Sequence, residues 1–139
     1  MNEINFQIKE IYPHPIQKVW ESITTQIGLE GWLMPNDFKL IEGYECTFRF
    51  CSTEEDEQDS QVMVRIIEFA APSHMVWHWR NDGEPEDSTV TFTLREVDGG
   101  TELTLQHTGP VAELLARELM KGWPTKLGAL QVHLWNECQ

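Results

Sequence analysis

The spacing of apolar residues changes period along the 139-residue chain, and this change limits the folds that it can adopt. Near the N-terminus, and again from residue 61 to residue 108, apolar and polar residues alternate as in strands with one buried face. Around residues 16–23 and after residue 111, apolar residues instead recur every three or four positions, as on one face of a helix. This order predicts an α+β domain whose helices gather on one side of an antiparallel sheet.

The first part of the chain predicts one strand and two short helices. Residues 4–12 alternate and predict a strand, which Pro13 ends. The apolar spacing over 16–23 predicts a short amphipathic helix with Pro15 in its first turn. A second short helix or turn is expected to carry Ile27, Leu29 and Trp32.

The middle of the chain predicts a series of strands and turns. After a turn at 35–37, Phe38 and Leu40 alternate up to Glu42-Gly43 and alternation continues beyond it to residue 50, which predicts a β-hairpin. The expected strands that follow are 61–70, 74–80, 88–96 and 101–108.

Residues 52–60 contain five carboxylates and no apolar residue, so burial cannot offset the entropy lost when this segment is ordered. We expect a solvated loop. A calcium loop is a weaker interpretation, because its turn glycine and its final bidentate Glu are both missing.

The C-terminal part of the chain predicts helix. We expect a break near Gly122, with Pro124 in the first turn of the longer C-terminal helix, because proline cannot donate the internal hydrogen bond. The apolar stripe comprises Val111, Leu114, Leu115, Leu119, Trp123, Leu127, Leu130 and Leu134.

These elements predict one domain over residues 1–139, in which a curved sheet of about six to seven strands wraps around the C-terminal helix. A concave, mostly apolar surface with one polar group suits a small-molecule pocket, but it is also the usual composition of a packed core, and packing is the favoured role for each single aromatic residue on it. The residues expected on the inner face are Met75, Trp77, Trp79, Val90, Phe92, Leu94, Leu103, Leu105 and His107.

The charge balance excludes some classes of partner. The chain has 10 basic and 23 acidic residues, and its net charge of −13 repels nucleic acid and anionic membranes. We found neither an apolar run long enough to span a membrane nor the start of a signal peptide. Three cysteines without paired spacing indicate reduced thiols in a cytoplasmic protein, with a Cys46–Cys51 bridge as the alternative. Monomer and homodimer both remain open.

A set of short motifs resembles the START-like (SRPBCC) helix-grip superfamily. These are Val19-Trp20, Leu29 to Trp32, Pro35, Glu42-Gly43, Glu68 with Pro72, and Trp77 to Trp79. Others resemble the small bacterial homologues of the activator of heat-shock-protein-90 ATPase: Thr91 to Thr93, Gly100 to Leu105, His107 to Gly109, and Gly122-Trp123 with Leu127 and Leu130.

This resemblance implies a cavity between the sheet and the C-terminal helix that takes a lipid, polyphenol or polyketide-like molecule. It also implies, as an alternative, a chaperone-associated or other protein-interaction module with a place in the stress response. The expected ligand-binding residues are Trp32, Phe48, Phe50, Trp77, Trp79, Phe92, His107, Trp123 and Leu127.

We find no catalytic or metal-binding motif and expect no cofactor, because the histidines are scattered and no phosphate loop or nucleophile elbow is present. His107 is the one candidate for acid–base chemistry, and a cyclase- or hydrolase-like enzyme would need it near Glu42 or Tyr44. The alternative role for His107 is a hydrogen bond to backbone near Thr108-Gly109. A non-catalytic binding protein is therefore the leading hypothesis.

Overall fold

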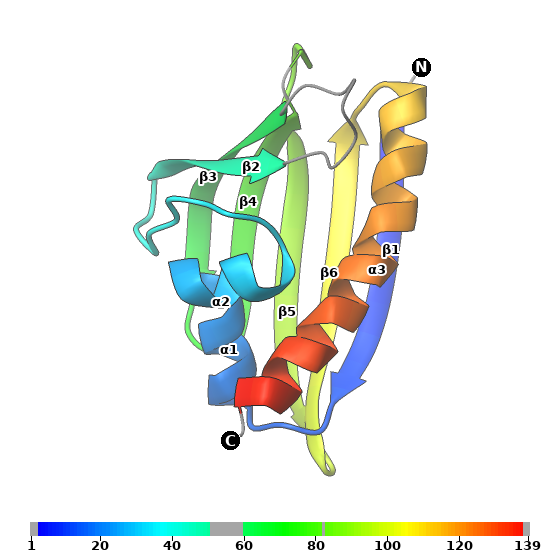
Figure 1. The fold of residues 1–139 in the computed structure, drawn as a ribbon. Helices are drawn as coiled ribbons and strands as arrows, with labels where there is room; N and C mark the ends of the chain where they lie inside the picture. The colour runs from blue at the N-terminus through cyan, green and yellow to red at the C-terminus, as the bar shows by residue number, and fades with distance from the viewer. Residues whose placement is uncertain (1–2, 51–59, 82, 138–139) are drawn as a thin grey trace.

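In the computed structural model, six antiparallel strands form one open sheet in the order β1-β6-β5-β4-β3-β2 (Figure 1). The structure describes residues 3–50, 60–81 and 83–137, and it describes residues 50, 60, 136 and 137 in backbone only. The strands are β1 (Glu3–Tyr12), β2 (Glu45–Phe50), β3 (Ser60–Ala70), β4 (His74–Asn81), β5 (Ser88–Val97) and β6 (Gly100–Pro110). The helices are α1 (Ile16–Thr24), α2 (Gln26–Trp32) and α3 (Glu113–Glu137). These elements confirm the predicted α+β class and its curved sheet.

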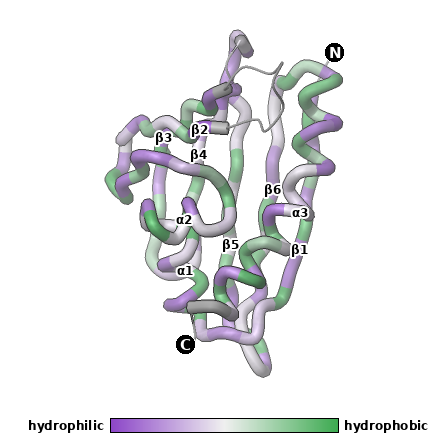
Figure 2. The backbone as a smooth tube through the Cα atoms, viewed as in Figure 1, coloured by the Kyte–Doolittle hydropathy of each residue, from purple (hydrophilic) through white to green (hydrophobic). Residues whose placement is uncertain are grey.

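All three helices lie on the same face of the sheet, and α3 runs along β1 before it slants toward α1 (Figure 1). The nine residues expected on the inner face are all buried, none more than 3% exposed. Figure 2 shows the corresponding mixture of hydrophobic and hydrophilic residues along the strands. Alternation therefore identified correctly which side of β4, β5 and β6 faces the helices.

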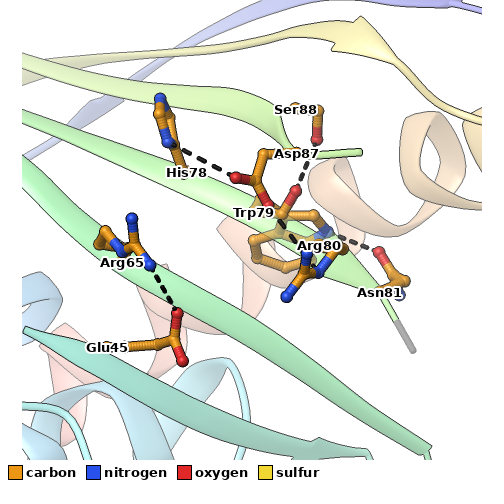
Figure 3. A network of polar contacts seen from close by, with 8 residues as sticks. All are labelled: Glu45, Arg65, His78, Trp79, Arg80, Asn81, Asp87 and Ser88. Atoms are coloured by element: carbon orange, nitrogen blue, oxygen red, sulfur yellow. Dashed lines mark hydrogen bonds and ion pairs between the residues drawn. The ribbon is translucent and has the colours of Figure 1, made fainter. Parts of the chain in front are cut away.

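The opposite face of the sheet carries polar side chains. Figure 3 shows Arg80 and His78 on either side of Asp87, with distances of 3.9 and 3.7 Å to its carboxylate oxygens. Arg65 of β3 pairs with Glu45 of β2 at 3.2 Å. His78 is thus part of the exposed face, as its parity in the sequence predicts.

The predicted hairpin before residue 50 is wrong. Residues 38–44 form no strand, and β2 pairs instead with β3. The side chains of Asn36 and Asp37 explain the difference, because each accepts a hydrogen bond from a backbone N–H, of Phe38 at 2.9 Å and of Thr47 at 2.6 Å. Such side-chain acceptors compete with the strand ladder for backbone donors.

The predicted helix break near Gly122 is also wrong, because α3 is continuous with Pro124 inside it. Packing on both sides of the proline accounts for the continuity. Trp123 and Leu127 are both buried, and the Tyr12 hydroxyl donates to the Leu127 carbonyl at 2.9 Å. The apolar stripe predicted for this helix is also wrong at Leu114, because the Leu114 side chain is 75% exposed.

Within the described residues, no helix is both long and apolar enough to cross a membrane. The second short helix or turn, expected to carry Ile27, Leu29 and Trp32, is the helix α2, where Leu29 and Trp32 are buried and Ile27 is 79% exposed.

Candidate functional site

A cavity of about 520 Å³ opens between α3, the ends of β3 and β4 that lie together, and the segment after α2. Its volume is within the range of small-molecule sites. Its walls are mostly apolar, and charged side chains stand only on the α3 side. The lining residues are Leu33, Met34, Val62, Trp79, Asn81, Leu115, Glu118, Leu119, Lys121, Gly122, Trp123, Thr125 and Lys126.

Two indole rings in contact with each other form part of this wall. Trp79 comes from β4 and Trp123 from α3, and their ring centroids lie 5.3 Å apart with planes tilted by 54°. The Trp79 indole N–H donates to the Asn81 side-chain oxygen at 2.6 Å, which fixes the ring relative to the strand (Figure 3). The sheet and the helix therefore meet at an aromatic contact that also borders the cavity.

His107 lies directly behind the two indoles and is completely buried. The Trp123 indole N–H donates to His107 Nδ1 at 3.0 Å, so this nitrogen is the acceptor. The proton therefore belongs on Nε2, which donates to Ser88 Oγ at 2.6 Å, and the Ser88 hydroxyl donates to the Trp79 carbonyl at 3.2 Å. This chain of hydrogen bonds joins α3, β6, β5 and β4.

This arrangement determines what His107 can do chemically. Burial lowers the pKa of His107 to about 4, so the ring is neutral near pH 7. Its one acceptor nitrogen is already used by Trp123, and neither Glu42 nor Tyr44 is near, because β5, β4 and β3 stand between β6 and β2. The expected backbone hydrogen bond of His107 is wrong, since its partners are side chains of β5 and α3.

The structure separates the residues predicted to bind a ligand into three groups. Trp79 and Trp123 line the cavity, and His107 supports both rings from behind. Phe48, Trp77 and Phe92 lie farther along the sheet, in the packed core, where their rings form a cluster together with Phe38. Trp32 and Leu127 belong to the same core, and the side chain of Phe50 lies outside the described residues.

Packing contacts hold the core residues in place. Trp77 lies 4.7 Å from Phe92 and 5.7 Å from Phe48, measured between ring centroids. The Trp32 indole N–H donates to the Ser22 carbonyl at 2.8 Å and so ties α2 to α1. None of these residues lines the cavity described above.

Several cavity residues were missed from the sequence. Leu115 and Leu119 were part of the predicted helical stripe, and with Gly122 they have the four- and three-residue spacing of one helix face. That spacing was a usable signal. Leu33 and Met34 follow α2 without regular structure, and no periodicity points to them.

Neither thiol chemistry nor metal binding finds support in the described residues. Cys46 is buried, and burial raises the pKa of its thiol to about 12, which suppresses the thiolate. No group of three His, Cys, Asp or Glu side chains in the described ranges is arranged to hold a metal ion.

Comparison with known proteins gives one family match and many matches of fold. The sequence profile described as "Activator of Hsp90 ATPase homolog 1-like protein" matches residues 13–134. No curated protein matched the chain. Protein MLL2253 from Mesorhizobium loti has a TM-score of 0.80 at 22% identity, covering 95% of this chain and 97% of that one.

Two further solved structures share the fold, and one of them is described by its place in a biosynthetic locus. CalU16 from Micromonospora echinospora has a TM-score of 0.72 at 23% identity, covering 98% of this chain and 85% of that one. DynU16, described as a protein in the dynemicin biosynthetic locus, has a TM-score of 0.80 at 18% identity, covering 96% of this chain and 47% of that one. At identities this low, the comparisons establish a shared fold and nothing more specific.

Proposed function

The chain belongs to the family of Activator of Hsp90 ATPase homolog 1-like proteins, and from this premise we propose that it binds an apolar or aromatic small molecule in the cavity between β4 and α3 without transforming it. The observation that carries the proposal is the cavity itself. Its interior presents leucine, methionine and indole surfaces, while its charged side chains all come from α3. A ligand with an apolar body removes those surfaces from water, which stabilises the complex by about 25 cal/mol per Å² of apolar area.

The state of His107 favours binding over catalysis. A general base needs a free lone pair that can reach a substrate proton. The lone pair of His107 accepts the Trp123 N–H instead, and its own proton is donated to Ser88. The His107 side chain therefore supports the two indole rings of the cavity wall.

A structural relative supports the same conclusion. DynU16, which shares the fold, is described as belonging to the dynemicin biosynthetic locus. A biosynthetic locus encodes the proteins that make a small molecule. A domain with a cavity of this size suits a protein that binds such a molecule.

The proposal is tested with a thermal-shift screen of lipids, flavonoids and polyketide-like aromatics, together with intrinsic tryptophan fluorescence. A ligand present at about one hundred times its Kd adds about 2.7 kcal/mol to stability. For a domain of this size that corresponds to a rise in Tm of several degrees, and fluorescence should change because Trp79 and Trp123 border the cavity.

A pair of glycine variants on α3 provides the specific control. Gly122 lines the cavity, and a Cβ built there meets no atom within 4 Å, so Gly122→Leu adds apolar bulk at the cavity wall without a clash at its Cβ. Gly128 also has open space around it but lies outside the cavity lining. We expect Gly122→Leu to lose the ligand-induced shift and Gly128→Leu to keep it. A wild-type protein that no compound stabilises would contradict the proposal and direct the search to protein partners.

A further inference from the structure

We propose that the ligand joins an apolar body to one negatively charged group, and that Lys121 and Lys126 of α3 hold this group at the mouth of the cavity. This inference rests on the proposed binding function and narrows the class of ligand.

The two lysines stand on the same part of α3 as the cavity. Lys121 and Lys126 both line it, together with Gly122 and Thr125. Residues 121 and 125, and residues 122 and 126, are one helical turn apart, so these four residues present one continuous wall. Lys126 is half-buried and Lys121 is exposed, which lets the aliphatic stems cover apolar surface while the ammonium groups stay at the opening.

Carboxylates pair with several arginines elsewhere in the protein, whereas Lys121 and Lys126, like Lys9, have no such partner among the described residues. What distinguishes Lys121 and Lys126 from Lys9 is that both line the cavity. Four arginines face carboxylates: Arg65, Arg80, Arg95 and Arg117. The ammonium groups of Lys121 and Lys126 form no ion pair or hydrogen bond with any other residue in the described ranges, and the Thr125 hydroxyl donates only to the Lys121 carbonyl. In a chain with 23 acidic and 10 basic residues, two ammonium groups without a carboxylate partner at one cavity indicate a place for an external anion.

Asn81 adds a donor on the opposite side of the mouth. Its side-chain oxygen accepts the Trp79 indole N–H, which assigns the other end of the amide as the NH₂ group. That nitrogen has no hydrogen-bond partner among the described residues, and Asn81 lines the cavity. A carboxylate or sulfonate at the mouth thus has a neutral donor on β4 and two cations on α3.

One charge at the mouth opposes the anion. Glu118 also lines the cavity, one turn before Lys121. The mouth therefore carries two positive charges and one negative charge, against a net charge of −13 for the whole chain. Removing the charge of Glu118 should therefore change the affinity for an anion in the opposite direction from removing the charges of the lysines.

The experiment compares two fluorescent probes that share an apolar body and differ in one charge: anilinonaphthalene sulfonate, which is anionic, and phenylnaphthylamine, which is neutral. We expect Lys121→Gln combined with Lys126→Gln to weaken binding of the sulfonate about three- to tenfold, the range of exposed ion pairs, and to leave the neutral probe unchanged. Glu118→Gln should strengthen binding of the sulfonate alone. Lys9→Gln, which changes an exposed lysine on β1 outside the cavity, is the charge-matched control.

The outcomes separate this inference from the function on which it rests. If Gly122→Leu abolishes binding of both probes while the lysine variants weaken only the sulfonate, both proposals are supported. Equal binding of the two probes, with no effect of the lysine variants, overturns the charged-group inference and leaves the binding function standing. Failure of both probes to bind the wild-type protein, or undiminished binding to Gly122→Leu, counts against the cavity as a binding site and against the inference with it.

Discussion

At the scale of single residues, His107 shows what alternation in a sequence reveals and what it omits. Its parity with Leu103 and Leu105 predicted an inward side chain, and the ring is completely buried. Its partners were not predictable, because Ser88 and Trp123 lie 19 and 16 residues away along the chain. They meet only through the register of β5 with β6 and the position of α3 over the sheet.

The buried state of His107 predicts a specific loss of stability in mild acid. The pKa of His107 is about 4 in the folded protein against 6.5 in an unfolded chain, so between these values the unfolded state binds more protons. The stability from the neutral ring is complete above pH 6.5 and is lost as the pH falls toward 4. The total loss is about 3 kcal/mol.

Urea unfolding of the wild type and of His107→Gln at pH 7 and at about pH 4.5 measures this effect. The carboxylates titrate in both proteins, so the difference between them isolates His107. We expect the wild type to lose about 2 kcal/mol more than the variant over this interval. Equal losses in the two proteins would show that His107 is not held neutral by the fold.

At the scale of elements, long alternating or helical runs were predictable and their exceptions were not. The strands from β3 to β6 agree with the sequence within a few residues. The hairpin failed because Phe38 is buried as a strand residue would be, while Asn36 and Asp37 take the backbone donors that a ladder needs. The helix break failed because a local cost at Pro124 is smaller than the packing of Trp123 and Leu127 on either side of it.

That local cost at Pro124 leads to a second prediction. Proline inside a helix removes one backbone hydrogen bond and costs about 3 kcal/mol, partly offset by about 1 kcal/mol from its restriction of the unfolded chain. We therefore expect Pro124→Ala to raise the free energy of unfolding by about 1–2 kcal/mol. Thr125→Ala, on the next position of the same exposed turn, restores no N–H and should gain less than 1 kcal/mol. A decrease in stability with Pro124→Ala would mean that α3 depends on the ring of the proline.

At the scale of the whole molecule, the architecture was predictable but the position of the cavity was not. The alternation of apolar residues identifies the inner face of β4, β5 and β6. Where that face remains uncovered depends on the path of α3, which packs along β1 and slants toward α1 (Figure 1). For this reason Trp77 and Phe92 lie wholly within the core, while Trp79, a core residue on the same strand as Trp77, also borders the cavity.

The charge of the whole molecule gives a third prediction. A net charge of −13 makes the folded state repel itself, and salt screens that repulsion. Raising sodium chloride from about 0.02 M to about 0.5 M shortens the screening length from about 20 Å to about 4 Å. We expect the Tm to rise by several degrees, and by less in a variant that combines Glu30→Gln with Glu96→Gln. A Tm that is unchanged or falls with salt would show that the ion pairs outweigh the repulsion.

The contact between Trp79 and Trp123 has an optical consequence. Two indoles whose centroids are 5.3 Å apart, with planes tilted by 54°, are close enough for their electronic transitions to couple. Such a pair gives an exciton couplet in the ultraviolet circular-dichroism spectrum, whose sign and amplitude depend on the relative orientation of the two chromophores. Since one ring belongs to the sheet and the other to α3, the couplet records any movement of the helix against the sheet without an added label.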